Sequence, residues 1–369
     1  MQPITLDRSR LERYANCPMQ GYLYTLAEAL KTKAEGKEEL YEWEKKMVAE
    51  ADPELVKKLS EIAGLSKGSI LCDSGDVIHK LIHKAFIECN QDIDLVPDWF
   101  LENLPKVRAD IQPEVRRAAR FVCDIIANLH VKVLSIEHQV DYCILPETKN
   151  RGAVVVTMRY DLICSGLNMS LHARDWKTGW KEWNNTETAD TFQAECGAWL
   201  LWQQPEYSNI EIVHWWYHYT RSGHHSYARF DRKYEHPKLP DLTTEVAIKE
   251  RIMTTVRSFL DGSKECWPEE QKCCWCDYIQ FCPNAHMHAV EIDKDTTGYV
   301  DNLIVMQAYV KKLKKAAKEW VKGKGAIEGK KYILDKKPPS NKFTVDFQSK
   351  DKAKGPAKVG DPDLDKHFE

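Results

Sequence analysis

The chain has 369 residues and a formal net charge of −3, so it can bury a large core in one elaborated domain or two and is not globally basic. Its 12 cysteines occur without a secretory signal peptide, which favours a reducing cytoplasm and metal-bound or buried thiols over a disulfide framework. No apolar run approaches the roughly 18 residues of a membrane-spanning helix, so the sequence predicts a cytoplasmic protein that does not enter a membrane.

Residues 1–72 are predicted to be mostly helical, and they contain Cys17 immediately before a proline. A second helical pattern, over residues 73–90, carries His79 near its start. A lone histidine on an amphipathic helix is more often structural than a ligand, so both interpretations of His79 stay open at this point.

A helix over residues 113–130 is followed by three predicted strands, near residues 134–144, 153–164 and 170–177. The second strand carries Asp161, and the third carries Asp175 and Lys177. Two carboxylates on neighbouring strands make a hard-oxygen site suited to Mg²⁺ or Mn²⁺. Side chains two residues apart in a strand point to the same face, so Lys177 can reach a water held by a metal at Asp175. An isolated Asp-x-Lys is usually a solvated surface pair, but here it follows an apolar strand with a second aspartate.

A helix at about residues 188–203 carries Gln193, and residues 210–219 are predicted to form a further strand. Since a helix crosses over between this strand and the one before it, parallel pairing is expected. Helix, three strands, helix and strand in this order make an α/β fold with an αβββαβ core. A helix over residues 243–261 then leads to a group of cysteines.

The late cysteines have the spacing C-x2-C-x5-C, at Cys273, Cys276 and Cys282. Thiolates separated by two residues can bind one soft metal centre from a single turn of backbone. With Cys17 as the fourth ligand, such a centre would join the two ends of the domain. Buried apolar cysteines, a zinc site and an iron–sulfur cluster are the three interpretations. Cys266 and Cys274 lie close by, and the spacing leaves their participation open.

The C-terminal part of the chain has a different character. Apolar residues recur at spacings of three and four and predict an amphipathic helix, with an apolar face of Leu303, Met306, Val310, Leu313, Ala317 and Trp320. The opposite face is rich in lysine, with Lys311, Lys312, Lys314, Lys315, Lys318 and Lys322. This lysine face is either simply solvated or binds phosphates or a partner. Residues 286–347 are therefore predicted to form a Lys-rich helix with short strands, and residues 348–369 a disordered tail.

The order and spacing of these motifs resemble the RecB-like exonucleases of the PD-(D/E)XK superfamily over residues 8–285. They are most similar to the iron–sulfur branch, which includes the CRISPR-associated RecB-like exonucleases and the AddB nuclease domain. That branch has a cysteine, G-x3-H, G-R-I-D, D-x-K-T-G, a glutamine helix and C-x2-C-x5-C, in this order. Here Gly75 and His79 match G-x3-H, while Met158 replaces the glycine of G-R-I-D. The tyrosine expected just after the glutamine is absent from the stretch 197–199.

The resemblance implies a restriction-endonuclease-like PD-(D/E)XK fold in residues 73–285, with a helical N-terminal insertion and an iron–sulfur staple. It also implies metal-assisted phosphodiester hydrolysis, with the metal held by His79, Asp161, Asp175 and the carbonyl group of Trp176. Lys177 would orient the attacking water, and Gln193 would hold that lysine or a phosphate. Glu137, in the strand before the hairpin, is a weaker candidate for the site.

The implied cofactors are Mg²⁺ or Mn²⁺ at the active site and a 4Fe–4S cluster at Cys17, Cys273, Cys276 and Cys282, with structural zinc as the alternative. The implied function is a DNA exonuclease that acts on free or single-stranded ends in recombination, repair or replication, together with a partner protein of such a process. The alternative is a non-catalytic DNA-binding or partner module that retains the fold. Similar C-terminal appendices occur in phage-borne relatives, and a phage origin would place the protein in the cytoplasm of a host cell.

Overall fold

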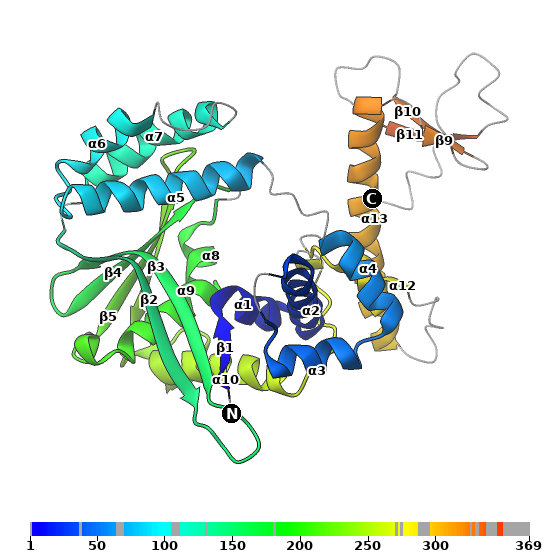
Figure 1. Cartoon of the computed structure of the whole chain (residues 1–369), viewed down its shortest axis with the longest axis horizontal. Helices are drawn as coiled ribbons and strands as arrows, with labels where there is room; N and C mark the ends of the chain where they lie inside the picture. The colour runs from blue at the N-terminus through cyan, green and yellow to red at the C-terminus, as the bar shows by residue number, and fades with distance from the viewer. Residues whose placement is uncertain are drawn as a thin grey trace. The chain divides into compact units, whose positions relative to one another are not determined.

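The structure is a computed structural model, and it describes residues 2–36, 39–63, 70–104, 111–129, 131–179, 182–269, 272–273, 276–286, 296–324, 327–328, 332–336 and 345–349. The chain divides into two compact units, Met1–Glu265 and Cys266–Glu369. The first unit contains a mixed sheet with helices on its faces, and the second contains a long helix and a small antiparallel sheet (Figure 1).

The first unit begins with a short strand followed by helices: β1 (Ile4–Asp7), α1 (Arg8–Asn16), α2 (Pro18–Glu35), α3 (Glu42–Glu50) and α4 (Pro53–Ala63). Asp7 caps α1, because its Oδ1 accepts a hydrogen bond from the Arg10 amide at 2.8 Å. Pro18 opens α2, at a position where the backbone N–H has no partner within the helix. The predicted helical character of this region is confirmed, but the strand β1 was not predicted.

One face of the sheet is covered by α5 (Ile70–Glu88), α6 (Val96–Asn103) and α7 (Gln112–Ala127) (Figure 1). Each helix buries apolar side chains at helical spacing, as Ile78, Ile82 and Phe86 do on α5. These side chains form one core with Leu162 and Trp176 of the sheet. α5 and α7 confirm the two helices predicted in this region.

The described strands of the main sheet after β1 are β2 (Val133–Leu145), β3 (Val154–Ser165), β4 (Ser170–Lys177), β5 (Ile212–Tyr219) and β6 (His225–Asp231). β3 pairs antiparallel with β2 and β4, as the three predicted strands require. β5 pairs parallel with β4, as expected after a helical crossover, and β6 returns antiparallel to β5. The predicted αβββαβ order is therefore present. Two short strands, β7 (Glu235–His236) and β8 (Leu239–Thr243), pair separately.

β1 and β4 share one edge of β3. β2 pairs with β3 along nearly its whole length, so it occupies the opposite edge. β1 runs parallel to the beginning of β3, from Val154 to Thr157, whereas β4 pairs only with the end of β3, from Leu162 to Ser165. The two strands therefore part along residues 158–161 of β3. The gap lies in the middle of the sheet, and it positions the polar residues described below.

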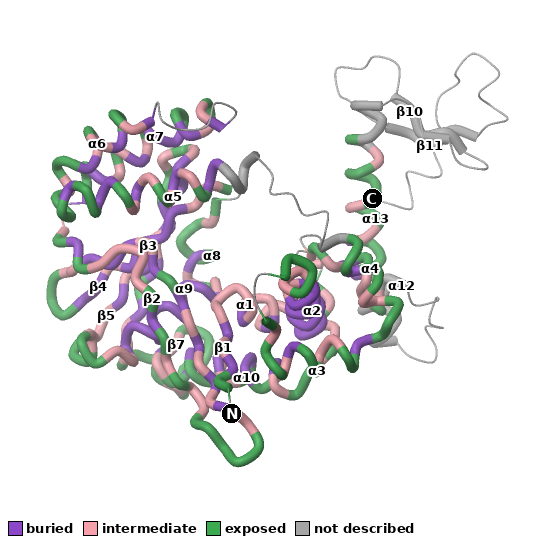
Figure 2. The backbone as a smooth tube through the Cα atoms, viewed as in Figure 1, coloured by how far each residue is buried: buried purple, intermediate pink, exposed green. Residues whose placement is uncertain are grey.

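The other face of the sheet is packed by α9 (Phe192–Trp202), which follows α8 (Asn185–Ala189) and precedes the short 3-10 helix η2 (Pro205–Tyr207). Every residue of α9 is buried (Figure 2), and α10 (Thr244–Leu260) contacts it. A Cβ on Gly197 would lie 2.2 Å from a ring carbon of Trp215, so glycine allows α9 to approach β5 this closely. The hydroxyl group of Tyr160 donates a hydrogen bond to the Gly197 carbonyl at 2.7 Å.

The described residues of the second unit form η3 (Ile279–Phe281), α12 (Pro283–His286), α13 (Thr296–Lys324) and a sheet of β9 (Ile327–Glu328), β10 (Tyr332–Lys336) and β11 (Val345–Ser349). The predicted amphipathic helix is present as α13. Its predicted apolar face is wrong, because several of its members are exposed: Leu303, Met306, Val310 and Leu313. The smaller Val305 and Ala308 are buried instead, against Ile279 and the cysteine segment. The disordered tail was predicted for residues 348–369. This is wrong for Gln348 and Ser349, because they pair within β11, and residues 350–369 lie outside the described part of the chain.

Among the described residues, no helix is both long enough and apolar enough to cross a membrane.

Candidate active site

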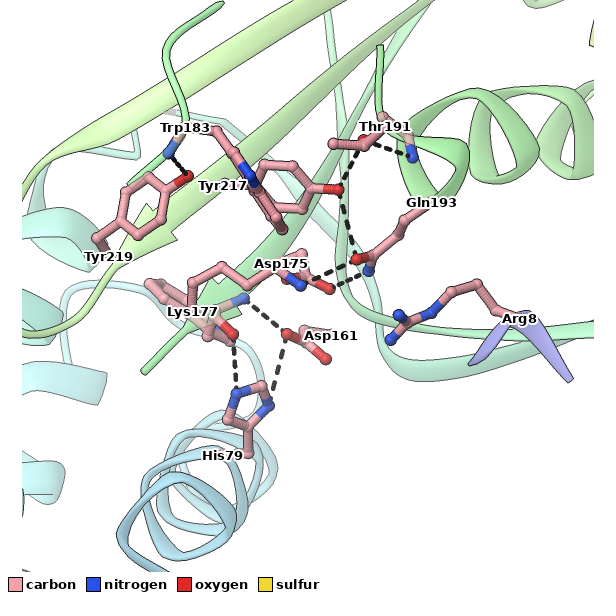
Figure 3. A network of polar contacts seen from close by, with 12 residues as sticks. Arg8, His79, Asp161, Asp175, Lys177, Trp183, Thr191, Gln193, Tyr217 and Tyr219 are labelled. Atoms are coloured by element: carbon pink, nitrogen blue, oxygen red, sulfur yellow. Dashed lines mark hydrogen bonds and ion pairs between the residues drawn. The ribbon is translucent and has the colours of Figure 1, made fainter. Parts of the chain in front are cut away.

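Polar side chains from four separate elements meet at the gap between β1 and β4 (Figure 3). They are the side chains predicted from the sequence: His79 from α5, Asp161 from β3, Asp175 and Lys177 from β4, and Gln193 from α9. Asp161 and Asp175 lie on neighbouring strands, and Asp175 and Lys177 lie on one face of the same strand. Residues as far apart in the sequence as His79 and Gln193 thus form one polar cluster between the sheet and its helices.

Asp175, Lys177 and Gln193 are joined to one another in a closed triangle. The Lys177 Nζ lies 2.7 Å from Asp175 Oδ2 and 2.9 Å from Gln193 Oε1. The Gln193 Nε2 donates a hydrogen bond to Asp175 Oδ1 at 2.6 Å, and the Tyr217 hydroxyl donates to Gln193 Oε1 at 3.4 Å. These contacts fix the orientation of the amide, because its oxygen faces the cation and its nitrogen faces the carboxylate.

Asp175 is 9% exposed, and its environment acts on its charge. Burial raises the pKa of this carboxyl group, the Lys177 ammonium lowers it, and the Asp161 charge raises it again, so the net pKa lies above the ordinary value. A carboxylate whose charge is destabilised in this way is stabilised by a nearby cation. A further cation beside Lys177 would therefore stabilise the ionised form of the Asp175 carboxyl group.

Asp161 and His79 are oriented by the backbone of Trp176. The Trp176 amide donates a hydrogen bond to Asp161 Oδ2 at 2.7 Å, and the Trp176 carbonyl oxygen lies 2.9 Å from His79 Nε2. A carbonyl only accepts hydrogen bonds, so Nε2 carries the proton and Nδ1 faces Asp161 Oδ2 at 3.5 Å. Burial lowers the pKa of His79, but the hydrogen bond and charge of Asp161 outweigh it and raise the pKa to about 9.

Glu137 belongs to the same cluster, although the sequence marked it only as a weaker candidate. The register of β2 and β3 places Glu137 across from Asp161. Ligand atoms of His79, Glu137 and Asp161 all lie within 4.8 Å of one another. Glu137 has φ of 48°, in the left-handed region that a non-glycine residue rarely adopts. Burial and the charge of Asp161 raise the pKa of Glu137. In the sequence, the only sign that Glu137 belongs to the site is its position in the strand before the hairpin.

The donor set of this cluster fits a hard divalent cation. Ligand atoms of His79, Glu137 and Asp161 converge, and Asp175 lies on the neighbouring strand beside Asp161. Mg²⁺ and Mn²⁺ prefer oxygen ligands and accept imidazole. The Trp176 carbonyl, also predicted as a ligand, has one lone pair that faces His79 Nε2 and a second that is not used by that contact. Adjacent carboxylates repel one another unless a cation lies between them, so the arrangement favours metal binding.

Aromatic rings line the lysine side of the site. The Lys177 Nζ lies 4.7 Å from the centroid of the Tyr217 ring and 5.9 Å from that of Trp183. The Trp183 amide donates to the Tyr219 hydroxyl oxygen at 2.7 Å, which holds the chain after β4 against β5 (Figure 3). The Trp176 ring faces away from the site and packs in the core under α5.

The cysteines predicted to share one centre lie in both units. In the second unit, Cys273, Cys276 and Cys282 pack against Ile279. The Sγ atom of Cys282 lies 3.7 Å from that of Cys266, close to the separation of about 3.8 Å expected for two thiolates on one tetrahedral metal with bonds of about 2.3 Å.

Cys17 and Cys274 are the remaining cysteines that the sequence brought into question. Cys17 belongs to the first unit, where its Sγ lies 3.8 Å from the Glu265 carbonyl oxygen. Cys274 lies outside the described residues. The structure thus brings Cys266 to Cys282, a pairing that the spacing alone left open.

Comparison with known proteins adds a family assignment to this geometry. A family model described as the PD-(D/E)XK nuclease superfamily matches residues 55–283, more than half of the chain. The solved structure of SSO0001 is similar with 11% identity and a TM-score of 0.26, over 56% of this chain and 84% of that one, and at this score it supports no argument. A search of curated proteins finds no match.

Proposed function

This chain belongs to the PD-(D/E)XK nuclease superfamily, and from this membership and its site we propose that it hydrolyses phosphodiester bonds of DNA with a divalent metal ion. The observation that carries the proposal is the triangle of Asp175, Lys177 and Gln193 beside the cluster of His79 and Asp161. These groups supply both a metal site and a positioned cation, which is what phosphodiester hydrolysis requires.

The proposal assigns one role to the metal ligands and another to Lys177. Asp161, Asp175, Glu137 and His79 would hold Mg²⁺ or Mn²⁺, which when bound polarises a phosphoryl oxygen and lowers the pKa of a bound water. Lys177 would orient the attacking water and offset negative charge that develops in the transition state.

Gln193 and the backbone of Trp176 would orient the side chains of Lys177 and His79, respectively. Gln193 would keep the ammonium of Lys177 in place through its 2.9 Å contact. Trp176 would hold the Nε2 proton of His79, so that Nδ1 is the nitrogen that would bind the metal once its own proton is lost.

We further propose that the enzyme is an exonuclease of the RecB-like type, acting on free or single-stranded DNA ends in recombination, repair or replication. The support for this finer assignment is the order of the motifs along the chain, from Cys17 to Cys282. The same resemblance would give it a partner protein of one of these processes and a phage origin. A non-catalytic DNA-binding module is the alternative. The complete set of Asp161, Asp175 and Lys177 argues against it, because binding alone does not need all three.

We also propose that the late cysteines hold a 4Fe–4S cluster, with zinc as the alternative metal. Cys17, Cys273, Cys276 and Cys282 are the ligands that the resemblance supplies. The 3.7 Å contact of Cys266 with Cys282 adds one more thiol to the candidates. Such a centre would close a very long loop of chain and stabilise the fold without taking part in hydrolysis.

The proposed function is tested by incubating the protein with end-labelled single-stranded DNA and Mn²⁺, with and without a chelator. Cleavage that the chelator stops, and that Asp175→Asn loses, would support it. Oligonucleotides blocked at one end or the other would then separate exonuclease from endonuclease activity and give the polarity. Binding of DNA without any cleavage, in protein shown to hold metal, would favour the non-catalytic alternative.

A further inference from the structure

Arg8 reaches the active site from the N-terminal end of the chain. It directly follows β1 and is the first residue of α1. Because β1 ends opposite Thr157 of β3, Arg8 emerges at the gap in the sheet that also contains Asp161. Figure 3 shows its guanidinium group pointing toward Gln193 and the neighbouring carboxylates. None of the roles proposed for His79, Asp161, Asp175, Lys177 and Gln193 involves this cation.

The contacts of Arg8 leave it able to bind an anion. Its Nη1 forms an ion pair with Glu12 Oε2 at 2.7 Å, across one turn of α1, and its side chain is 31% exposed. A guanidinium group has five N–H donors in a planar fork, and the Glu12 contact uses one nitrogen. Burial lowers the pKa of Arg8, but the charges of Glu12 and Asp175 outweigh it and raise the pKa, so the group keeps its charge beside the site.

Arg8 and Lys177 differ in what surrounds them. Lys177 is held between Asp175 and Gln193, which suits it to orient a water. Arg8 lies on the other side of the carboxylates, with a partner on its own helix (Figure 3). A DNA strand brings negatively charged phosphates close to these carboxylates. The repulsion between the phosphates and the carboxylates must be offset by a cation outside the metal site. Arginine suits this task, because its fork matches two oxygens of one phosphate.

We propose that Arg8 binds a backbone phosphate of the DNA strand that enters the active site. This inference rests on the proposed nuclease function and adds a substrate-binding residue to it. The guanidinium would hold the phosphate through the N–H groups that the Glu12 contact does not use. A simple i,i+4 ion pair on a helix surface would be the structural alternative, and it would contribute only to the stability of α1.

The test compares Arg8→Met, Arg8→Lys and Glu12→Gln in the full-length protein. With Mn²⁺ and a labelled single-stranded oligonucleotide, Arg8→Met should raise KM roughly 10- to 100-fold, the loss expected for a hydrogen bond to a charged group, with a smaller effect on kcat. Arg8→Lys should recover part of the loss. Glu12→Gln is the matched control, because it breaks the same ion pair but keeps the guanidinium, so its KM should stay near that of the wild type.

Direct DNA binding separates this inference from the proposed function. In an Asp175→Asn background, Arg8→Met should make the dependence of affinity on salt shallower by roughly 0.7, the slope for one phosphate contact on a single strand. An equal effect on 5′-phosphorylated and 5′-hydroxyl oligonucleotides would assign an internal phosphate, and an effect on the former alone would assign the terminal one. Equal losses of thermal stability in Arg8→Met and Glu12→Gln, with KM and salt slope unchanged, would overturn the inference even if the wild type cleaves DNA.

Discussion

A Cβ on Gly75 would lie 2.6 Å from the hydroxyl oxygen of Thr178, closer than real Cβ atoms approach a neighbour. Gly75 lies in α5 one turn before His79, and Thr178 directly follows the end of β4. The glycine therefore lets α5 pass close to the strand that carries Asp175 and Lys177. The same approach brings His79 Nε2 to 2.9 Å from the Trp176 carbonyl. The G-x3-H spacing is thus explained by contact between a helix and the end of a strand.

Gly75→Ala should lower activity by displacing α5 from β4. We expect a fall in kcat/KM of roughly 10- to 100-fold, because small displacements of a catalytic group have effects of this size. Overpacking of this kind costs about 1–3 kcal/mol, partly offset by the higher helix propensity of alanine, about 1 kcal/mol. Steady-state kinetics and thermal unfolding check both values. Asp76→Ala, at the exposed neighbouring position, is the control, and equal activity in the two variants would contradict the explanation.

Asp175→Asn and Lys177→Met should each abolish DNA cleavage, by at least about a hundredfold, while DNA binding survives. Asp175→Asn would remove a proposed metal ligand that is also the partner of Lys177. Lys177→Met would remove the cation proposed to orient the water. Both are measured with end-labelled DNA and Mn²⁺ in protein free of host nucleases. Lys233→Met is a surface control, because that lysine is 74% exposed. Full cleavage by Asp175→Asn would show that the active site is elsewhere.

Glu137→Gln should weaken Mn²⁺ binding, because it removes one carboxylate charge from the cluster with His79 and Asp161. Calorimetric titration with Mn²⁺ measures this, and a loss of roughly tenfold in affinity is expected. Glu137→Gly should weaken binding as well, but without metal it should unfold at a higher temperature than Glu137→Gln. The reason is that glycine adopts the positive φ of this position without the strain of about 1 kcal/mol that a side chain causes there. Unchanged Mn²⁺ affinity in both variants would remove Glu137 from the metal site.

If the proposed metal centre is present, Cys266→Ser and Cys282→Ser should both lower the metal content of the protein, because the two thiols lie 3.7 Å apart. The measurement is iron, zinc and acid-labile sulfide in protein purified without oxygen. Iron with sulfide would support the cluster, and stoichiometric zinc without sulfide would support the alternative metal. Cys143→Ser, at an exposed cysteine of the first unit, is the control. If Cys266→Ser keeps its full metal content, the contact with Cys282 is packing alone.

Arg232 and Glu245 should stabilise the fold in a pH-dependent manner. Arg232 Nε and Nη2 bind the two oxygens of Glu245 at 2.7 and 2.9 Å. Burial raises the pKa of Glu245, but the hydrogen bonds from Arg232 and Gln203 outweigh it and lower the pKa below the ordinary value. A lowered folded-state pKa stabilises the protein fully above the pKa of the unfolded chain, and this contribution is lost as the pH falls through the folded value.

Urea unfolding of the wild type and Arg232→Met checks this expectation. The difference in unfolding free energy should be about 1 kcal/mol near about pH 7 and should shrink toward about pH 4. A difference that stays constant over this range would mean that Arg232 stabilises by packing rather than by its charge. Lys45→Met, which removes the ion pairs of an exposed lysine with Glu39 and Glu42, should show little change at either pH.

Local sequence patterns were enough to predict the parts of the site that lie within one strand or between strands joined by a turn or a helical crossover. Strand alternation placed Asp175 and Lys177 on one face, and the hairpin placed Asp161 beside them, as the structure confirms. The helical crossover predicted parallel pairing of β5 with β4, which is also observed. The same rules predicted a helix that carries Gln193. These features depend on backbone geometry over a few residues, and so they can be read from a local pattern.

Contacts between segments far apart in the sequence could be read only from the structure. β1 is four residues long, too short for its sequence to show the period of a strand. Its pairing with β3 defines it as a strand and brings Arg8 to the site. Glu137 became a site residue through its position across from Asp161, and Cys266 became a partner of Cys282. On α13 the periodic pattern predicted a buried face that includes Leu303, Met306 and Val310. In the structure these residues are exposed, and Val305 and Ala308 are buried instead. The physical reason is that contacts between distant elements depend on the fit and free energy of packing between surfaces, which local spacing does not specify.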